Sequence, residues 1–297
     1  QKGVQVKLGL GTVQFGIDYG ISNHDGKTSL DEIENILDVA MRKGISVIDT
    51  AAMYGTSEEA LGQTLSESHS FKIVTKTPRF AHSAIITSDD VQRLEDSFSQ
   101  SLHKLKRASI YGLLIHNADD LLSKNGNLLF AKMSELKQKG LVEKIGVSVY
   151  TALQIDKILE NFQIDIVQLP INIFDQRLLI SGHLSKLKKR GVEIHARSAF
   201  LQGLLLMSPE TLPPFFDSVR DHLENYHRTI HQHGLTPVRA ALGFLISIPD
   251  IDCIICGVNN HTQLEEICTE AGTVESMDFS RFALNDECVL NPSNWRY

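Results

Sequence analysis

The sequence has few cysteines and no long hydrophobic run. Its 297 residues include four cysteines, Cys253, Cys256, Cys268 and Cys288, and their spacing resembles no disulfide framework. Apolar runs stay well below the roughly 18 residues needed to span a bilayer. The first residues show no signal-peptide pattern. These features predict a cytoplasmic protein with reduced thiols and no membrane partner.

Cys253 and Cys256 are spaced as in C-x-x-C redox and zinc motifs, but they lie in an apolar run that resembles a strand. Residues three apart on a strand point to opposite faces, so the two thiols would not share a metal or form a disulfide. Structural cysteines are therefore favoured over a redox or zinc site, and we expect no metal.

Positive charge is in deficit. Lys and Arg total 29 against 36 Asp and Glu, which leaves a formal net charge of −7. A nucleic-acid surface needs a basic stripe or patch, so this balance argues against a nucleic-acid partner. We expect a small-molecule ligand instead. The oligomeric state is open between a monomer and a simple homo-oligomer.

Short apolar runs alternate with longer amphipathic segments along the whole chain. The strand-like runs are 6–10, 46–48, 72–75, 111–115, 144–147, 164–169, 192–195 and 252–255. The helix-like segments are 30–42, 58–65, 90–105, 127–139, 152–161, 182–189, 238–247 and 261–270. Eight strand–helix repeats in about 300 residues favour an α/β fold, a (β/α)8 TIM barrel, as a single domain over 1–297.

An open doubly wound sheet is the alternative, and it would usually carry a glycine-rich turn after its first strand. Residues 9–14 read GLGTVQ, with Gln14 where G-x-G-x-x-G requires its third glycine. Two further features depart from a minimal barrel. An extra helical segment is expected at about 215–233, and a tail at about 272–297 could fold over the active mouth.

Local signals mark where the segments begin and end. Ser29 and Glu32 have capping-box spacing at the head of the first helix, and Gly44 follows its end. His227 and His231 on the extra segment have i,i+4 metal spacing without a carboxylate motif, so a solvated helix face is favoured over a metal site.

Four polar residues follow three neighbouring strands, where the active site of a barrel lies. They are Asp49, Tyr54, Lys76 and His116. Tyr54 could donate a proton to a carbonyl oxygen as hydride arrives on carbon, with a pKa lowered by a nearby Lys76 ammonium. Asp49 would hold the lysine, and His116 would orient the substrate. Each residue alone is more often structural than catalytic, but the combination favours a carbonyl reductase.

The same residues resemble the signature of the aldo-keto reductase family. Residues 48–55 read IDTAAMYG, similar to the family's D-T-A-x-x-Y-G, and Lys76 in TKT and His116 in LIHN match its lysine and histidine. GLGT at 9–12 and GVS at 146–148 match its first and fifth strands. The resemblance implies NAD(P)H bound across the barrel mouth without a Rossmann fold, and reversible reduction of an aldehyde or ketone.

Family cofactor contacts transfer unevenly. Thr12 and Asp49 match positions near the nicotinamide, and Ser148 and Gln168 match those that bind its carboxamide, although Val149 replaces the usual asparagine. Residues 196–201 read ARSAFL where the family has A-Y-S-P-L. Ser198 and Leu201 keep their positions, but Arg197 replaces the tyrosine that stacks on nicotinamide. A guanidinium can also stack, or it could contact substrate or phosphate.

The loop after the last strand departs further. Residues 257–267 read GVNNHTQLEEI, with Gly257 and Gln263 where NADPH-binding members carry cations. Asn259 could serve ribose or phosphate, and backbone donors at the helix start could still hold a phosphate. The resemblance favours NADP(H) and the residues weaken that preference, so we expect NADP(H) to be slightly favoured and NAD(H) to be usable.

Two alternative functions remain. A dinucleotide-binding regulatory subunit on the same barrel, with little turnover, is kept open by the changes at Val149 and Arg197. A barrel metallohydrolase would want paired histidines after the first strand, where TVQF stands instead. Aromatic residues that could line the mouth, or equally be core, are Phe15, Tyr19, Phe80, Phe200 and Trp295.

Overall fold

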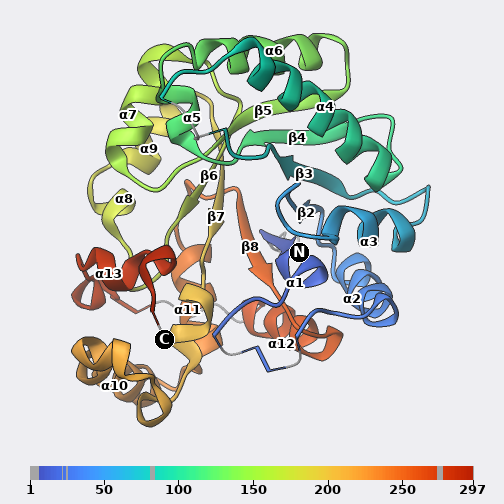
Figure 1. Ribbon diagram of the computed structural model, residues 1–297. Coiled ribbons are helices and arrows are strands. Elements are labelled where there is room, and N and C mark those ends of the chain that lie inside the picture. Colours follow the sequence, from blue (N-terminus) through green and yellow to red (C-terminus); the bar gives the residue numbers. More distant parts are fainter. Residues whose placement is uncertain (1–6, 22, 25, 81–83, 273–276, 297) are drawn as a thin grey trace.

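The computed structural model describes residues 7–21, 23–24, 26–80, 84–272 and 277–296, and it forms a closed barrel of eight parallel strands (Figure 1). The strands are β1 (Leu8–Gly11), β2 (Val47–Asp49), β3 (Lys72–Lys76), β4 (Ile110–Ile115), β5 (Val142–Ser148), β6 (Ile166–Pro170), β7 (Glu193–Arg197) and β8 (Cys253–Gly257). β8 pairs with β1 and closes the ring. The single-domain TIM barrel expected from the sequence is thus confirmed.

Helices surround the barrel in the alternating order that the sequence pattern predicts (Figure 1). They are α1 (Val13–Gly16), α2 (Leu30–Arg42), α3 (Ser57–Thr64), α4 (Ser88–Leu105), α5 (Ala118–Leu122), α6 (Asn127–Gln138), α7 (Ala152–Asn161), α8 (Arg177–Ile180), α9 (His183–Lys189), α10 (Asp217–Gln232), α11 (Pro237–Ile246), α12 (His261–Ala271) and α13 (Glu287–Leu290). Short 3₁₀ turns, η1 (Leu201–Leu206) to η5 (Pro292–Asn294), lie between β7 and the C-terminus. The described helices include none that could cross a bilayer.

The ends of α2 show how local sequence sets a helix. Ser29 accepts a hydrogen bond from the backbone nitrogen of Glu32, and Gly44 follows the helix with φ of +74°, a conformation that suits glycine. The expected capping box is only half formed, however. The Glu32 carboxylate turns away from Ser29 and accepts bonds from His261, at the start of α12.

The buried side chains form two layers, one inside the barrel and one between the barrel and its helices. Cys253 belongs to the inner layer and Cys256 to the outer one, so the two thiols face opposite sides of β8 as the strand spacing predicts. The four cysteines are free thiols. Among the described residues, the structure shows no group of three side chains placed to hold a metal ion.

His222 and His227, two of the three histidines of α10, do not lie on a solvated face. This corrects the sequence interpretation, which extends to all the histidines of this segment, whereas His231 is exposed as expected. Nε2 of His222 lies 3.0 Å from the carbonyl oxygen of Phe282, and Nε2 of His227 lies 2.8 Å from that of Leu205. Both imidazoles are half-buried and tie α10 to neighbouring segments, a role that sequence spacing alone does not distinguish from metal binding.

Candidate active site

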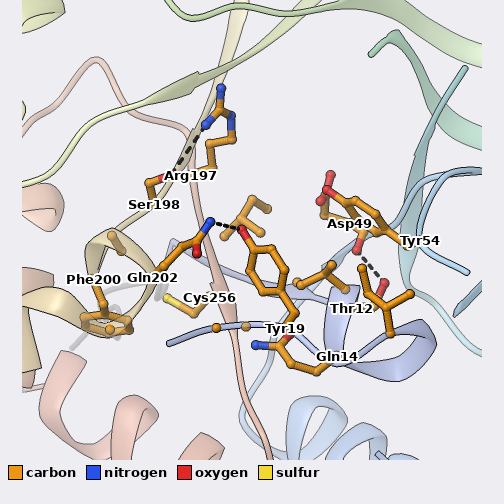
Figure 2. Close-up of a pocket in the computed structure, with 18 of the residues that line it drawn as sticks. Thr12, Gln14, Tyr19, Asp49, Tyr54, Arg197, Ser198, Phe200, Gln202 and Cys256 are labelled. Atoms are coloured by element: carbon orange, nitrogen blue, oxygen red, sulfur yellow. Dashed lines mark hydrogen bonds between the residues drawn. The ribbon is translucent and has the colours of Figure 1, made fainter. Parts of the chain in front are cut away.

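A cleft of about 460 Å³ opens at the carboxyl end of the barrel strands (Figure 2). That volume falls within the range of about 300–1,000 Å³ typical of small-molecule sites. The predicted site residues that line it are Thr12, Asp49, Tyr54, Lys76, His116, Ser148, Gln168, Arg197, Ser198, Gly257, Asn259 and Gln263. Leu201 does not line it, and its side chain packs in the hydrophobic core instead.

Lys76 and Asp49 form a buried ion pair beneath the cleft. Nζ of Lys76 lies 2.8 and 2.9 Å from the two carboxylate oxygens, and it also donates to the carbonyl oxygen of Thr50 at 2.8 Å. Gln168 donates to Asp49 Oδ1 at 2.7 Å. Burial lowers the pKa of Lys76, but the carboxylate outweighs it and the pKa lies above its ordinary value. The ammonium is therefore charged at neutral pH.

Tyr54 lies over this pair. Nζ of Lys76 is 5.0 Å from the centroid of the phenol ring, and the His116 ring stands edge-on to it at 6.0 Å. Burial raises the pKa of Tyr54, the Lys76 charge lowers it, and the Asp49 carboxylate raises it again. The net pKa lies above the ordinary value. The sequence expectation of a lowered pKa is corrected here, because it omitted both the burial of the phenol and the charge of Asp49.

His116 is neutral at physiological pH. Burial, followed by the charges of Lys76, Arg79 and Arg197, lowers its pKa to about 3. Its backbone nitrogen donates to Thr77 Oγ1 at 3.2 Å, while ring Nδ1 is buried without a partner among the described residues. A neutral imidazole in this position carries one N–H, so it can hydrogen-bond a carbonyl oxygen without adding charge to the site.

Ser57 connects the first two strand ends and was missed by sequence reasoning. Its hydroxyl donates to Thr12 Oγ1 at 2.8 Å and lies 3.0 Å from Thr50 Oγ1, and Thr12 Oγ1 lies 2.8 Å from the carbonyl oxygen of Asp49. The three hydroxyls are fully buried. They fix the loop that carries Asp49 and Tyr54, but a serine three residues after a tyrosine is too common to signal this.

Arg197 reaches across β6 rather than standing free. Its Nη2 donates to the carbonyl oxygen of Val149 at 3.1 Å, and its guanidinium carbon lies 4.4 Å from the centroid of the Tyr150 ring. This is cation–π geometry. The arginine that replaces the expected stacking tyrosine thus has an aromatic partner of its own. Tyr150 also lines the cleft, and sequence reasoning did not single it out.

A hydrogen bond between distant loops crosses the cleft in Figure 2, where Gln202 donates to the hydroxyl oxygen of Tyr19 at 2.7 Å. Tyr19 follows α1, whereas Gln202 lies in η1, where its φ of +51° is unusual for a residue with a side chain. The sequence marked Tyr19 as a possible lining aromatic. It could not pair Tyr19 with a glutamine far along the chain.

The other aromatic candidates separate into two groups. Phe200 lines the cleft, whereas Phe15 and Phe80 are buried in the core. Trp295 packs edge-on against Phe216, with ring centroids 4.9 Å apart. The described part of the tail, 277–296, contributes nothing to the lining, so the expectation that it folds over the mouth is not met there. Residues 273–276 and 297 lie outside the described chain.

The far end of the cleft is formed by the end of β8. A Cβ at Gly257 would lie 2.8 Å from the amide of Gln14, whose Oε1 is buried without a partner among the described residues. The backbone nitrogen of Asn259 donates to Gln263 Oε1 at 2.8 Å, and that of Gln263 donates to Asn260 Oδ1 at 2.8 Å. These donors at the start of α12 are occupied by protein groups, contrary to the expectation that they stay available for a phosphate.

The fold and the site together define a TIM-barrel protein with a buried tyrosine, an ion pair and a neutral histidine at its mouth. The profile of the Aldo/keto reductase family matches residues 7–283. The chain therefore belongs to the aldo/keto reductase family, which places its chemistry among the oxidoreductases.

Known relatives agree with this assignment. Aldo-keto reductase YhdN of Bacillus subtilis (strain 168) is 25% identical over 92% of this chain and 87% of its own length. The solved structure of aldo-keto reductase AKR11C1 from Bacillus halodurans has a TM-score of 0.73 at 19% identity, covering 93% of this chain and 89% of that one. Glycerol dehydrogenase AKR11B4 from Gluconobacter oxydans has a TM-score of 0.70 at 19% identity, with 98% and 95% covered. The two structural likenesses establish the fold.

Proposed function

We propose that this protein reversibly reduces an aldehyde or ketone to the alcohol, with NAD(P)H as the hydride source and Tyr54 as the proton donor. The observation that carries the proposal is the phenol of Tyr54, kept protonated by burial and lying 5.0 Å above a charged, buried lysine. A protonated phenol is the form that a reduction requires. The resemblance of the surrounding motifs to the family supports the same reaction.

The polar groups that line the cleft suit a nicotinamide dinucleotide. Gln168 uses its amide nitrogen on Asp49, which leaves its carbonyl oxygen to accept from a carboxamide beside the Ser148 hydroxyl. At the other end, the orphaned oxygen of the buried Gln14 amide faces the end of β8. Thr12, Asp49, Ser198, Asn259 and Gln263 complete the proposed contacts. When bound, the reduced nicotinamide supplies the hydride.

The chain's own residues would divide the remaining work. Tyr54 gives its phenolic proton to the carbonyl oxygen, and the Lys76 ammonium stabilises the phenolate that this leaves. Asp49 is a positioning residue, because it acts by holding the lysine in place through two hydrogen bonds. His116 donates a hydrogen bond to the same oxygen and orients the substrate. In the reverse reaction the phenolate accepts the proton from the alcohol.

The test is a screen of aldehydes and ketones with both reduced cofactors. The reaction is monitored by the loss of the near-ultraviolet absorbance of the reduced nicotinamide. We expect turnover with at least one simple aldehyde. The alternative, a regulatory subunit on the same barrel, predicts that the dinucleotide binds in calorimetry but that no carbonyl compound is reduced at a useful rate. Binding and turnover measured on the same preparation separate the two functions.

Arg197 is proposed to contact the cofactor, and its replacement gives a first quantitative expectation. Arg197→Ala removes a guanidinium that lines the cleft and stacks on Tyr150. We expect the dinucleotide dissociation constant to rise by about tenfold, as for the loss of a charge-assisted contact, while the melting temperature changes little. Tyr150→Phe is the control, because it keeps the ring beneath the guanidinium. An unchanged dissociation constant with a raised substrate KM would assign Arg197 to the substrate instead.

Gln263→Arg should strengthen NADPH binding selectively, because it restores a cation at a position where phosphate-binding family members carry one. A cation acts through long-range attraction, so the gain should be larger at low salt than at high salt. The glutamine also accepts from Asn259, and Gln263→Met loses this bond without adding charge, which makes it the matched control. A Gln263→Arg gain shared equally by NADH would show that this position does not read the 2′-phosphate.

Neutral residues at 257 and 263 leave both dinucleotides usable, and the wild-type dissociation constants should lie within about thirtyfold of each other. The slight advantage of NADP(H) expected from the sequence depends on what surrounds the start of α12.

A further inference from the structure

The start of α12 carries a carboxylate that belongs to another helix. Glu32, in the first turn of α2, places Oε1 2.6 Å from the backbone nitrogen of His261 and 2.6 Å from its ring Nδ1. Its other oxygen accepts from Asn35 at a longer 3.3 Å. The two helices are neighbours because β1 and β8 close the barrel (Figure 1). A side chain far away in the sequence therefore occupies the first turn of α12.

This carboxylate bonds His261, a residue beside the β8 end of the proposed dinucleotide site. His261 stands between Asn259 and Gln263 in the chain, and both of those residues line the cleft. The catalytic residues come from the ends of β2, β3 and β4, whereas this end is formed by β8. Since the nicotinamide must meet Tyr54, an extended dinucleotide would place its adenosine half toward β8.

Charge at this end is unfavourable for an additional phosphate. Partial burial raises the pKa of Glu32, but the bonds from His261 outweigh it, and the pKa lies below its ordinary value. The carboxylate is thus ionised at neutral pH. The nearby cation Arg42 bonds Glu265 from the last turn of α2, at the opposite end of that helix. The helix start, which would attract an anion, already has one.

The two cofactors differ at one group, and Glu32 distinguishes them physically. A 2′-phosphate carries between one and two negative charges at neutral pH, and like charges brought together at a binding site are strongly unfavourable. A ribose hydroxyl can instead donate to the carboxylate, which makes a charge-assisted hydrogen bond. An acidic side chain that meets the ribose is also how Rossmann proteins prefer NAD over NADP.

We propose that Glu32 is a specificity-determining residue that makes this protein prefer NAD(H) to NADP(H). The inference rests on the proposed function, and it reverses the slight preference for NADP(H) expected from the sequence. The reason for the reversal is a tertiary contact between α2 and the start of α12. The family positions at 257 and 263 are neutral, and the ionised group that bonds the start of α12 is an acid from a different helix.

The test measures dissociation constants by calorimetry for NADH and NADPH with wild type, Glu32→Gln and Glu34→Gln. Glutamine keeps an oxygen for His261 and removes only the charge, so the fold should persist. Glu34→Gln is the matched control, an exposed acid on the same helix. We expect wild type to bind NADH more tightly. Glu32→Gln should strengthen NADPH binding by about tenfold or more without strengthening NADH, and Glu34→Gln should change neither.

A salt titration of the wild type needs no variant, and it tests independently whether the protein repels or attracts the 2′-phosphate. Charges common to the two cofactors cancel in the ratio of their dissociation constants. Repulsion of the 2′-phosphate by Glu32 is screened as salt rises, so the preference for NADH over NADPH should weaken. If a cation attracted the 2′-phosphate instead, added salt would weaken NADPH binding and strengthen the preference for NADH.

Three results would overturn the assignment of Glu32. They are a wild type that prefers NADPH, a Glu32→Gln effect equal for the two cofactors, and a preference for NADH that grows as salt is added. Each of these leaves the proposed reaction intact. Binding of neither dinucleotide would overturn the proposed function as well, so the two failures are distinguishable.

Discussion

Tyr54→Phe should lower the rate of carbonyl reduction by about a hundredfold or more, because general acid catalysis typically contributes between about 10² and 10⁴. The variant removes one hydroxyl and keeps the ring that stands edge-on to His116. Dinucleotide affinity should therefore persist. Single-turnover and steady-state rates with a good aldehyde, together with calorimetric cofactor binding, make the measurement.

Tyr19→Phe is the matched control for this experiment. It removes a second phenol hydroxyl in the same cleft, one that accepts a bond from Gln202. The proton-transfer step should survive that change. A Tyr54→Phe enzyme that works at close to the wild-type rate would remove Tyr54 from the assigned role.

The pH dependence follows from the raised pKa of Tyr54. Reduction needs the protonated phenol, and burial keeps it protonated beyond its ordinary pKa of about 10. His116 has a pKa of about 3 and does not titrate near neutrality. We therefore expect kcat for reduction to stay level across the neutral range and to fall only in strong alkali. A fall centred near pH 6.5 would indicate a titrating histidine.

The second large effect is expected at the ion pair. Lys76→Met removes the charge that stabilises the phenolate, so kcat should fall by about as much as in Tyr54→Phe. It also leaves Asp49 buried without its cation, and breaking a buried pair in this way costs about 3–5 kcal/mol of stability. Asp49→Asn should lower kcat through the same lysine. Rates and melting temperatures are measured on all variants.

The double variant Lys76→Met/Asp49→Asn separates a joint role from two independent ones. Because Asp49 acts by holding Lys76, the double variant should lose far less activity than the product of the two single losses. It should also be more stable than Lys76→Met, since no uncompensated buried charge remains. Losses that multiply strictly would show that the two residues act independently.

The barrel could be predicted because its strands and helices are marked by local patterns of apolar residues in the sequence. The alternation of short apolar runs with amphipathic segments placed every strand within about two residues of its observed position, apart from Val6, which lies outside the described chain. Parallel strands ending at one rim then bring Asp49, Lys76 and His116 together. The cluster at the mouth follows from topology, so no knowledge of side-chain packing was needed to expect it.

What could not be predicted depends on contacts between distant segments. Gln202 meets Tyr19, and Glu32 meets His261, across more than 180 residues of chain. The pKa of Tyr54 was expected to fall because Lys76 is near. The structure raises it, since burial and a carboxylate act together against the lysine. The sequence pattern identifies which groups are present, whereas their combined effect on a pKa depends on how the folded chain places them.

The most direct measurement of the central claim follows hydrogen from the cofactor to the product. The protein is incubated with an aldehyde and a reduced nicotinamide dinucleotide deuterated at C4 on both faces, and the alcohol is examined by mass spectrometry. We predict one deuterium on the former carbonyl carbon of each alcohol molecule, with Tyr54→Phe forming the same product far more slowly. Alcohol without deuterium, or no alcohol from any aldehyde despite tight cofactor binding, would contradict the account.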